Sequence, residues 1–205
     1  RGGLSVAAQL GDTQWHGSLT ELSGTGALPF NLNSATSVTL SKEYIALAAA
    51  ELSVAGGKIS LKRNEWTPHH WRSRGSFTGI GLRFAQLAQT KRIASEAQEA
   101  LRLGGTWDIS SAAQLTGDLH LFRESGDLRL SGAPPFALGL EKLQLTARAS
   151  GGKINAELSA TGQRMGKLDA NITLPLMRSG SVWQVAATSP LSGNVSLIAT
   201  DLAWL

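Results

Sequence analysis

Few residues of this 205-residue chain have the types and spacing that catalysis requires. His69 and His70 are adjacent, but neighbouring positions on a strand point to opposite faces, and a metal site needs further ligands. The carboxylates mostly border turns, and no pair within a short motif indicates a general acid and a general base. No G-x-S-x-G nucleophile elbow and no phosphate-binding loop occur. We therefore expect neither an enzyme, nor a metal site, nor a cofactor.

A basic region from Lys62 to Arg92 holds seven Lys or Arg residues and one acid, Glu65. With Trp66 and Trp71 between them, these residues could form a nucleic-acid surface. They could also lie at an apolar–polar boundary near phospholipid headgroups, or form a solvated rim. Because the basic residues are spread over strands, a turn and a helix, membrane contact is favoured over nucleic acid, and we expect no nucleic-acid partner.

The composition is that of a folded protein with many tight turns. Hydrophobic residues make up 42% of the chain and charged residues 17%, with 23 glycines and a net charge of +4. The absence of cysteine excludes disulfides and thiolate metal sites. No apolar run reaches the roughly 18 residues that a membrane-spanning helix needs.

Alternation of apolar and polar residues is the dominant pattern. Leu101, Leu103, Trp107 and Ile109 all have odd numbers and polar residues lie between them, which predicts a strand with one apolar face. Seventeen strands are expected on this basis: 4–10, 14–22, 30–33, 37–41, 44–50, 51–55, 58–63, 70–80, 101–110, 114–123, 127–131, 137–140, 142–149, 153–160, 167–174, 181–187 and 193–199. The short glycine-containing connections predict antiparallel hairpins. A shift of apolar parity predicts a bulge or turn near Glu141.

Residues 83–100 break this pattern. They contain no Gly or Pro, and Phe84, Leu87 and Ala88 have helical spacing, which predicts one or two short helices. This helical insert would close the end of a sheet or form a lid over an apolar surface.

Half-apolar antiparallel strands can bury their faces in a sandwich, in a closed barrel, or in a long sheet that curls around a groove. The strands are about twice as many as a sandwich commonly uses, and no sign of two domains accompanies them. We expect an all-β fold in which residues 1–205 form a single segment. Because the alternation runs to the last residues, we expect this segment to be a piece of a longer protein.

The chain resembles the TamB family, the inner-membrane-anchored subunits of the bacterial translocation and assembly module, and more loosely the AsmA-like proteins. The residues that carry the resemblance are the run 101–109, the run 115–128, residues 140–145, the hairpin around Gly151 and Gly152, residues 189–193 and residues 201–204. The resemblance implies a long antiparallel sheet, folded over like a taco around an open apolar groove. It also implies a periplasmic segment of an inner-membrane-anchored protein of a Gram-negative bacterium, with an N-terminal anchor outside this chain.

In that family setting, the implied function is to bind phospholipid and conduct it between the inner and outer membranes, in support of outer-membrane biogenesis. The alternative is a chaperone-like module that receives outer-membrane protein strands beside a TamA-like barrel partner; an adhesin-like β domain is a further alternative. The residues expected to line the groove are Leu101, Leu103, Trp107, Ile109, Leu115, Leu119, Leu121, Leu143, Leu145, Ile154, Leu158, Leu168, Ile172, Val195 and Leu197.

Overall fold

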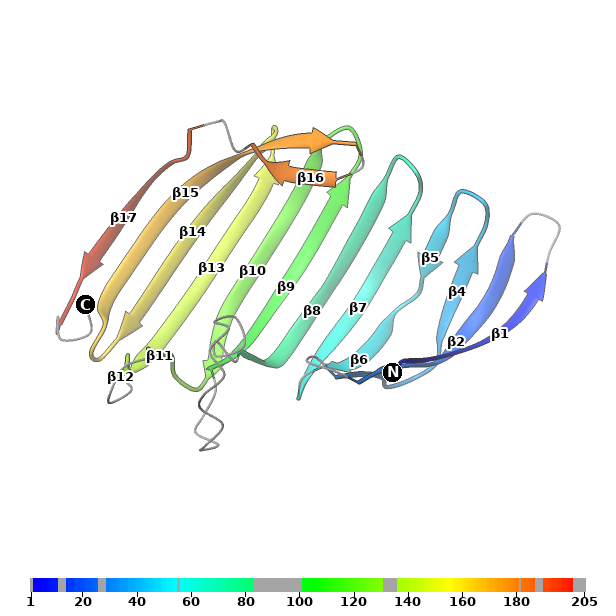
Figure 1. Ribbon diagram of the computed structural model, residues 1–205, viewed down its shortest axis with the longest axis horizontal. Coiled ribbons are helices and arrows are strands. Elements are labelled where there is room, and N and C mark those ends of the chain that lie inside the picture. Colours follow the sequence, from blue (N-terminus) through cyan, green and yellow to red (C-terminus); the bar gives the residue numbers. More distant parts are fainter. Residues whose placement is uncertain are drawn as a thin grey trace.

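The structure, a computed structural model, describes residues 2–10, 14–25, 29–54, 56–82, 101–130, 136–180, 182–186 and 190–200. Every regular element in these residues is a β-strand, which confirms the all-β prediction (Figure 1). The strands are β1 (Gly2–Leu10), β2 (Trp15–Gly24), β3 (Phe30–Leu32), β4 (Thr36–Leu40), β5 (Ile45–Leu47), β6 (Ala50–Val54), β7 (Gly57–Trp66), β8 (Trp71–Leu82), β9 (Leu101–Ser111), β10 (Leu115–Ser125), β11 (Arg129–Leu130), β12 (Phe136–Ala137), β13 (Leu140–Ser150), β14 (Lys153–Gly162), β15 (Gly166–Ser179), β16 (Val182–Val185) and β17 (Ser192–Ile198).

Fifteen of these strands form one long antiparallel sheet, and β11 and β12 form a separate two-stranded ribbon. The sheet is a meander, in which strands that follow one another in sequence lie side by side (Figure 1). β3 and β4 behave as two halves of one strand, because both pair with β2; β5 and β6 behave in the same way against β7. Short hairpin connections explain this order, since they leave each strand next to its predecessor.

Each of the seventeen strands expected from the sequence overlaps one of the seventeen observed strands. The bulge predicted near Glu141 is confirmed, because the register between β13 and β14 shifts between Leu140 and Lys142. The largest boundary difference is at the end of β15, which was expected at residue 174 and extends to Ser179. Leu140 begins β13 instead of ending the strand before it. The helices expected at 83–100 lie outside the described residues.

Two glycines of β8 and β9 make room for aromatic rings on the same side of the sheet. Gly75 lies opposite Trp107, and Gly105 lies opposite Phe77. A Cβ atom at Gly75 would come within 2.5 Å of the Trp107 ring, and one at Gly105 within 2.6 Å of the Phe77 ring. The two rings pack with their centroids 6.3 Å apart. Because a shifted register would put side chains under these rings, the pairing of glycine with aromatic residues stabilises this register.

The second half of β15 leaves the sheet and pairs with β16, forming a hairpin that we call the crossing hairpin (residues 176–185). Its Trp183 Nε1 donates a hydrogen bond to Ser111 Oγ at 2.8 Å, and its Arg178 Nη1 donates one to the Ala112 carbonyl at 3.0 Å. Ser111 ends β9, and β14, β13 and β10 lie between β9 and β15 in the sheet. The crossing hairpin therefore spans the ends of these three strands (Figure 1).

The opposite ends of the same strands contain a cluster of buried hydrophobic residues. We call this group the buried cluster; its members are Leu101, Leu103, Leu138, Leu140, Ala160 and Met165, all 2–6% exposed. Asp127 holds the segment that covers the cluster, since its carboxylate accepts hydrogen bonds from the backbone N–H groups of Leu128, Gly139 and Leu140 at 2.7–2.9 Å. Leu138 is thereby placed over β9 and is only 4% exposed.

Replacement of a leucine in the buried cluster should weaken the fold more than the same replacement elsewhere on the sheet. We expect Leu103→Ala to lower the free energy of unfolding by about 2–5 kcal/mol, because it leaves a cavity among packed side chains. Leu197→Ala, at a site that is 39% exposed, should cost about 1 kcal/mol or less. Urea denaturation followed by circular dichroism measures both values, and equal costs would contradict the assignment of the core.

Candidate functional site

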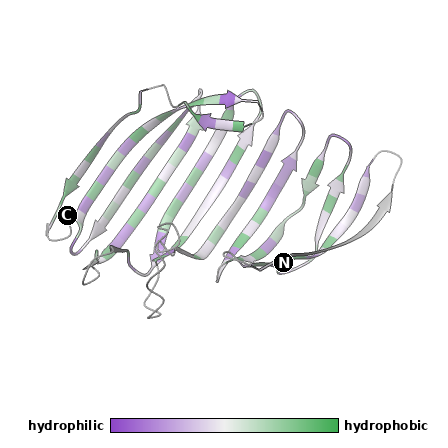
Figure 2. Ribbon diagram, in the orientation of Figure 1, coloured by the Kyte–Doolittle hydropathy of each residue, from purple (hydrophilic) through white to green (hydrophobic). Residues whose placement is uncertain are grey.

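The register of the sheet places all fifteen residues expected to line a groove on one face, which we call the apolar face. Directly opposed residues of an antiparallel pair point to the same side, so a row can be followed from strand to strand. One such row runs through Trp107, Leu119, Ala147, Ala156, Ile172 and Gly193. A parallel row runs through Leu121, Leu145, Leu158, Ala170 and Val195. Figure 2 shows the underlying alternation of apolar and polar positions along these strands.

The apolar face extends into the N-terminal half of the sheet, which the sequence-based site prediction did not include. A row crosses from Phe77 through Ile59 and Leu52 to Leu32. A second row crosses from Trp71 through Trp66 to Ile45. The apolar residues of 30–33 and 51–55 carry the signal in the sequence, but strands of three to five residues are too short to show which face each residue joins.

Exposure varies strongly over the apolar face. The buried cluster closes one end of β9, β13 and β14, whereas most other apolar side chains in this part are half-buried. At the C-terminal edge Ile172, Val195 and Leu197 are 39–66% exposed. Among the described residues, no large side chain is less than 2% exposed. The apolar face is therefore accessible over much of its area and not the core of a two-layered domain.

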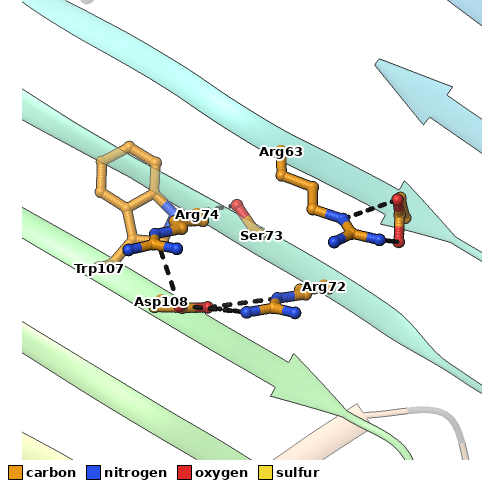
Figure 3. Close-up of polar contacts among 7 residues, drawn as sticks. Arg63, Arg72, Ser73, Arg74, Trp107 and Asp108 are labelled. Carbon is orange, nitrogen blue, oxygen red and sulfur yellow. Dashed lines mark hydrogen bonds and ion pairs between the residues drawn. The ribbon is translucent and has the colours of Figure 1, made fainter. Parts of the chain in front are cut away.

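A short polar chain interrupts the apolar face beside β9. Trp107 Nε1 donates a hydrogen bond to Ser73 Oγ at 2.9 Å (Figure 3). Ser73 Oγ in turn donates one to Asn64 Oδ1 at 2.8 Å. The amide nitrogen Asn64 Nδ2 is enclosed and has no hydrogen-bond partner among the described residues. These hydrogen bonds orient the Trp107 ring, and the unpartnered amide nitrogen is a local energetic cost.

The opposite face of the sheet carries paired charges. Arg63 bonds to Glu65 at 2.8 Å, while Arg72 and Arg74 approach the Asp108 carboxylate at 3.2 and 3.5 Å (Figure 3). A hydrogen bond to Glu65, together with its negative charge, raises the pKa of Arg63. These arginines belong to the basic region noted in the sequence, and their ion pairs reduce the positive charge available to a nucleic acid.

The same pattern continues toward the C-terminal half. Arg148 bonds to Asp118 at 2.6 Å, and this contact raises the pKa of Arg148. Lys167 bonds to Asp169 at 2.8 Å, and this hydrogen bond lowers the pKa of Asp169. Cross-strand and next-but-one charge pairs of this kind suit a solvated surface.

No family model, no curated protein and no solved structure matches this chain. In the residues that the structure describes, no helix is long and apolar enough to cross a membrane.

No group of three or more His, Cys, Asp or Glu side chains that could hold a metal ion occurs in the described part of the chain. His69 is exposed and His70 is half-buried; both lie in the turn between β7 and β8. There the Thr67 hydroxyl donates to the His70 carbonyl and accepts from the His70 N–H, both at 2.9 Å. The two histidines thus belong to a tight turn, and the candidate site that the geometry supports is the apolar face itself.

Loss of the central hydroxyl of the polar chain should destabilise the apolar face locally. We expect Ser73→Ala to cost about 1–3 kcal/mol, because it leaves Trp107 Nε1 and Asn64 Oδ1 without partners. Urea denaturation gives the free energy of unfolding.

Ser76→Ala provides the matched control, since Ser76 lies on the same strand but faces the other side, opposite Thr106. Its cost should stay within about 0.5 kcal/mol. A Ser73→Ala variant as stable as this control would show that the polar chain contributes nothing.

Proposed function

We propose that the long sheet curls so that its apolar face becomes the floor of an open groove, and that this groove binds phospholipid and conducts it between the inner and outer membranes. On this proposal the chain is a periplasmic segment of an inner-membrane-anchored protein, supports outer-membrane biogenesis and performs no catalysis. The single observation that carries it is the continuous apolar face, which stays accessible over much of its area. The resemblance to the TamB family is the second support.

The energetics favour a ligand with long apolar chains. Each methylene group removed from water is stabilised by about 0.8 kcal/mol, so ten buried methylenes give about 8 kcal/mol before the entropic cost of ordering the chain. The rows of Leu, Ala, Ile and Val repeat from strand to strand at about 4.8 Å. An acyl chain that moves from one row to the next loses and gains similar contacts, which keeps the free-energy barriers to sliding low.

Length is consistent with a conduit segment. Counting β3 with β4 and β5 with β6 as single strands, and leaving out the crossing hairpin, twelve strands follow one another from β1 to β17. At about 4.8 Å per step the apolar face then extends over roughly 50 Å. This exceeds the roughly 30 Å hydrocarbon thickness of one bilayer, so several lipids could lie along the face at once.

The second candidate function is that of a chaperone-like module that receives outer-membrane protein strands beside a TamA-like barrel partner. One observation favours it: all seven residues of β17 are exposed, with Val195 and Ile198 66% and 67% exposed, and the strand contains no charged residue. An exposed edge strand without charges is a template for pairing with another strand.

The amount of phospholipid that copurifies with the chain distinguishes the two functions, and mutation of the apolar face tests whether the lipid is bound there. The purified chain is extracted with organic solvent and the extract is quantified by mass spectrometry. We expect phospholipid at or above one molecule per chain, and about a tenfold loss in Leu119→Asp, because an unpaired charge on the apolar floor is costly to bury. Thr116→Asp adds the same charge to β10 on the other face and should leave lipid content unchanged.

Circular dichroism must first show that both variants are folded. A folded Leu119→Asp variant with undiminished phospholipid would contradict the groove. A lipid-free wild-type chain that captures strand peptides of outer-membrane proteins would support the chaperone-like function instead.

A further inference from the structure

We propose that phospholipid bound to the apolar face has a fixed polarity. Its phosphate end lies at the rim that carries Trp66, Trp71 and Trp183, and its acyl chains run along the strands toward the buried cluster. This inference rests on the proposed function, because it concerns how the same face would hold the same ligand.

The tryptophans of this rim share one row of the sheet. Trp15 lies opposite Leu40, Leu40 opposite Ile45, Ile45 opposite Trp66, Trp66 opposite Trp71, and Trp71 opposite Ser111. The hydroxyl of Ser111 then accepts the hydrogen bond from Trp183 of the crossing hairpin. Four of the six tryptophans of the chain thus lie at one rim of the apolar face, which we call the tryptophan rim.

Indole rings suit the boundary between acyl chains and headgroups. The ring is apolar and its N–H is a donor, so tryptophan concentrates where one side of the ring is dry and the other is wet. Trp66 is 45% exposed, whereas Ser111, on the far side of Trp71 in the row, is only 4% exposed. The tryptophan rim is therefore partly wet and partly dry, as the region around a lipid glycerol must be.

A positive charge lies at the same rim. The Arg178 guanidinium is 5.9 Å from the centre of the Trp183 ring, and Arg178 donates to the carbonyls of Ala112 and Gly180 at 3.0 Å. In the described part of the chain no carboxylate forms an ion pair with Arg178. Its charge remains available to a phosphate, which pairs well with a guanidinium.

The other rim has the opposite character over β9, β13 and β14. The buried cluster lies there, about ten residues from Ser111 along β9, or roughly 33 Å at 3.3 Å per residue. The cluster consists of Leu, Ala and Met side chains, which offer a phosphate no hydrogen-bond donor. The cation nearest in register is Arg123, opposite Leu103, and its guanidinium donates to the carbonyls of Gly126 and Glu141 at 2.8 and 3.1 Å. The two rims therefore distinguish the two ends of a phospholipid.

The chain contains no cysteine, which allows single fluorophores to be attached at chosen positions. Two single-cysteine variants are made and labelled. Gln114→Cys lies in the turn beside the tryptophan rim, and Gln163→Cys lies in the turn beside the buried cluster; both residues are exposed. Each protein is loaded from vesicles of phosphatidylcholine with a nitroxide on the headgroup or at the end of one acyl chain. Gel filtration then removes the vesicles before quenching is measured.

We expect the headgroup nitroxide to quench the probe at position 114 at least about threefold more than the probe at 163, since the two sites lie about 30 Å apart. The acyl-chain nitroxide should show the reverse order. A Trp66→Ala/Arg178→Gln double variant should retain lipid but lose most of this preference. Arg148→Gln, on the other face of the sheet, is the matched control and should keep it.

Equal quenching at both positions, or the reverse order, with lipid retained would overturn the fixed polarity and leave the proposed function intact. Absence of lipid after gel filtration would overturn both. Quenching that occurs only while vesicles are present would show that the tryptophan rim contacts a bilayer surface, which also contradicts the fixed polarity.

Discussion

The register of the antiparallel ladder is the constraint on which the rest of this structure depends. A slip of one residue would transfer every side chain of a strand to the other face, so a continuous apolar face requires correct register across the whole sheet. Where the apolar residues of a strand change from odd to even numbers, a bulge keeps them on the same face. In β7, Ile59 and Leu61 share the apolar face with Asn64 and Trp66 because the register shifts between Leu61 and Arg63. A second shift lies in β8, between Phe77 and Ile80 in its pairing with β9, and it contains Gly79, whose φ is +66°.

Because so few side chains on the apolar face are buried, the stability of this sheet comes mainly from contacts between adjacent strands. Each strand contacts mainly the strands beside it, so its stability resembles that of repeat proteins, in which local units and their interfaces contribute separately. The buried cluster and the crossing hairpin add contacts between strands that are not adjacent in the sheet. Ser111 and Trp183, for example, are separated by 72 positions.

The sequence was sufficient to predict the strands, their antiparallel pairing, the bulge near Glu141 and fifteen residues that share the apolar face from β9 to β17, because alternation acts directly on side-chain direction. It did not predict the N-terminal part of that face, where the strands are short. Contacts that depend on three-dimensional proximity could not be predicted in this way. Neither the hydrogen bond from Trp183 to Ser111 nor the hydrogen bonds that link Trp107 to Asn64 through Ser73 produce a periodic pattern in the sequence. The row of tryptophans likewise becomes visible only when the register is known.

The two directions within the apolar face have different physical consequences for a mobile ligand. Along the strands the environment changes from the tryptophan rim to the buried cluster, which on the proposed polarity would hold a ligand with a polar and an apolar end in one orientation. Across the strands the floor repeats similar apolar rows, so movement in that direction changes few contacts. On the proposed function the apolar rows would supply most of the affinity and the rim would decide where a ligand rests, since Trp15, Trp66, Trp71 and Trp183 occur only at some of the strands. The proposed orientation and the proposed transport are thus compatible on one surface, because they act along perpendicular axes.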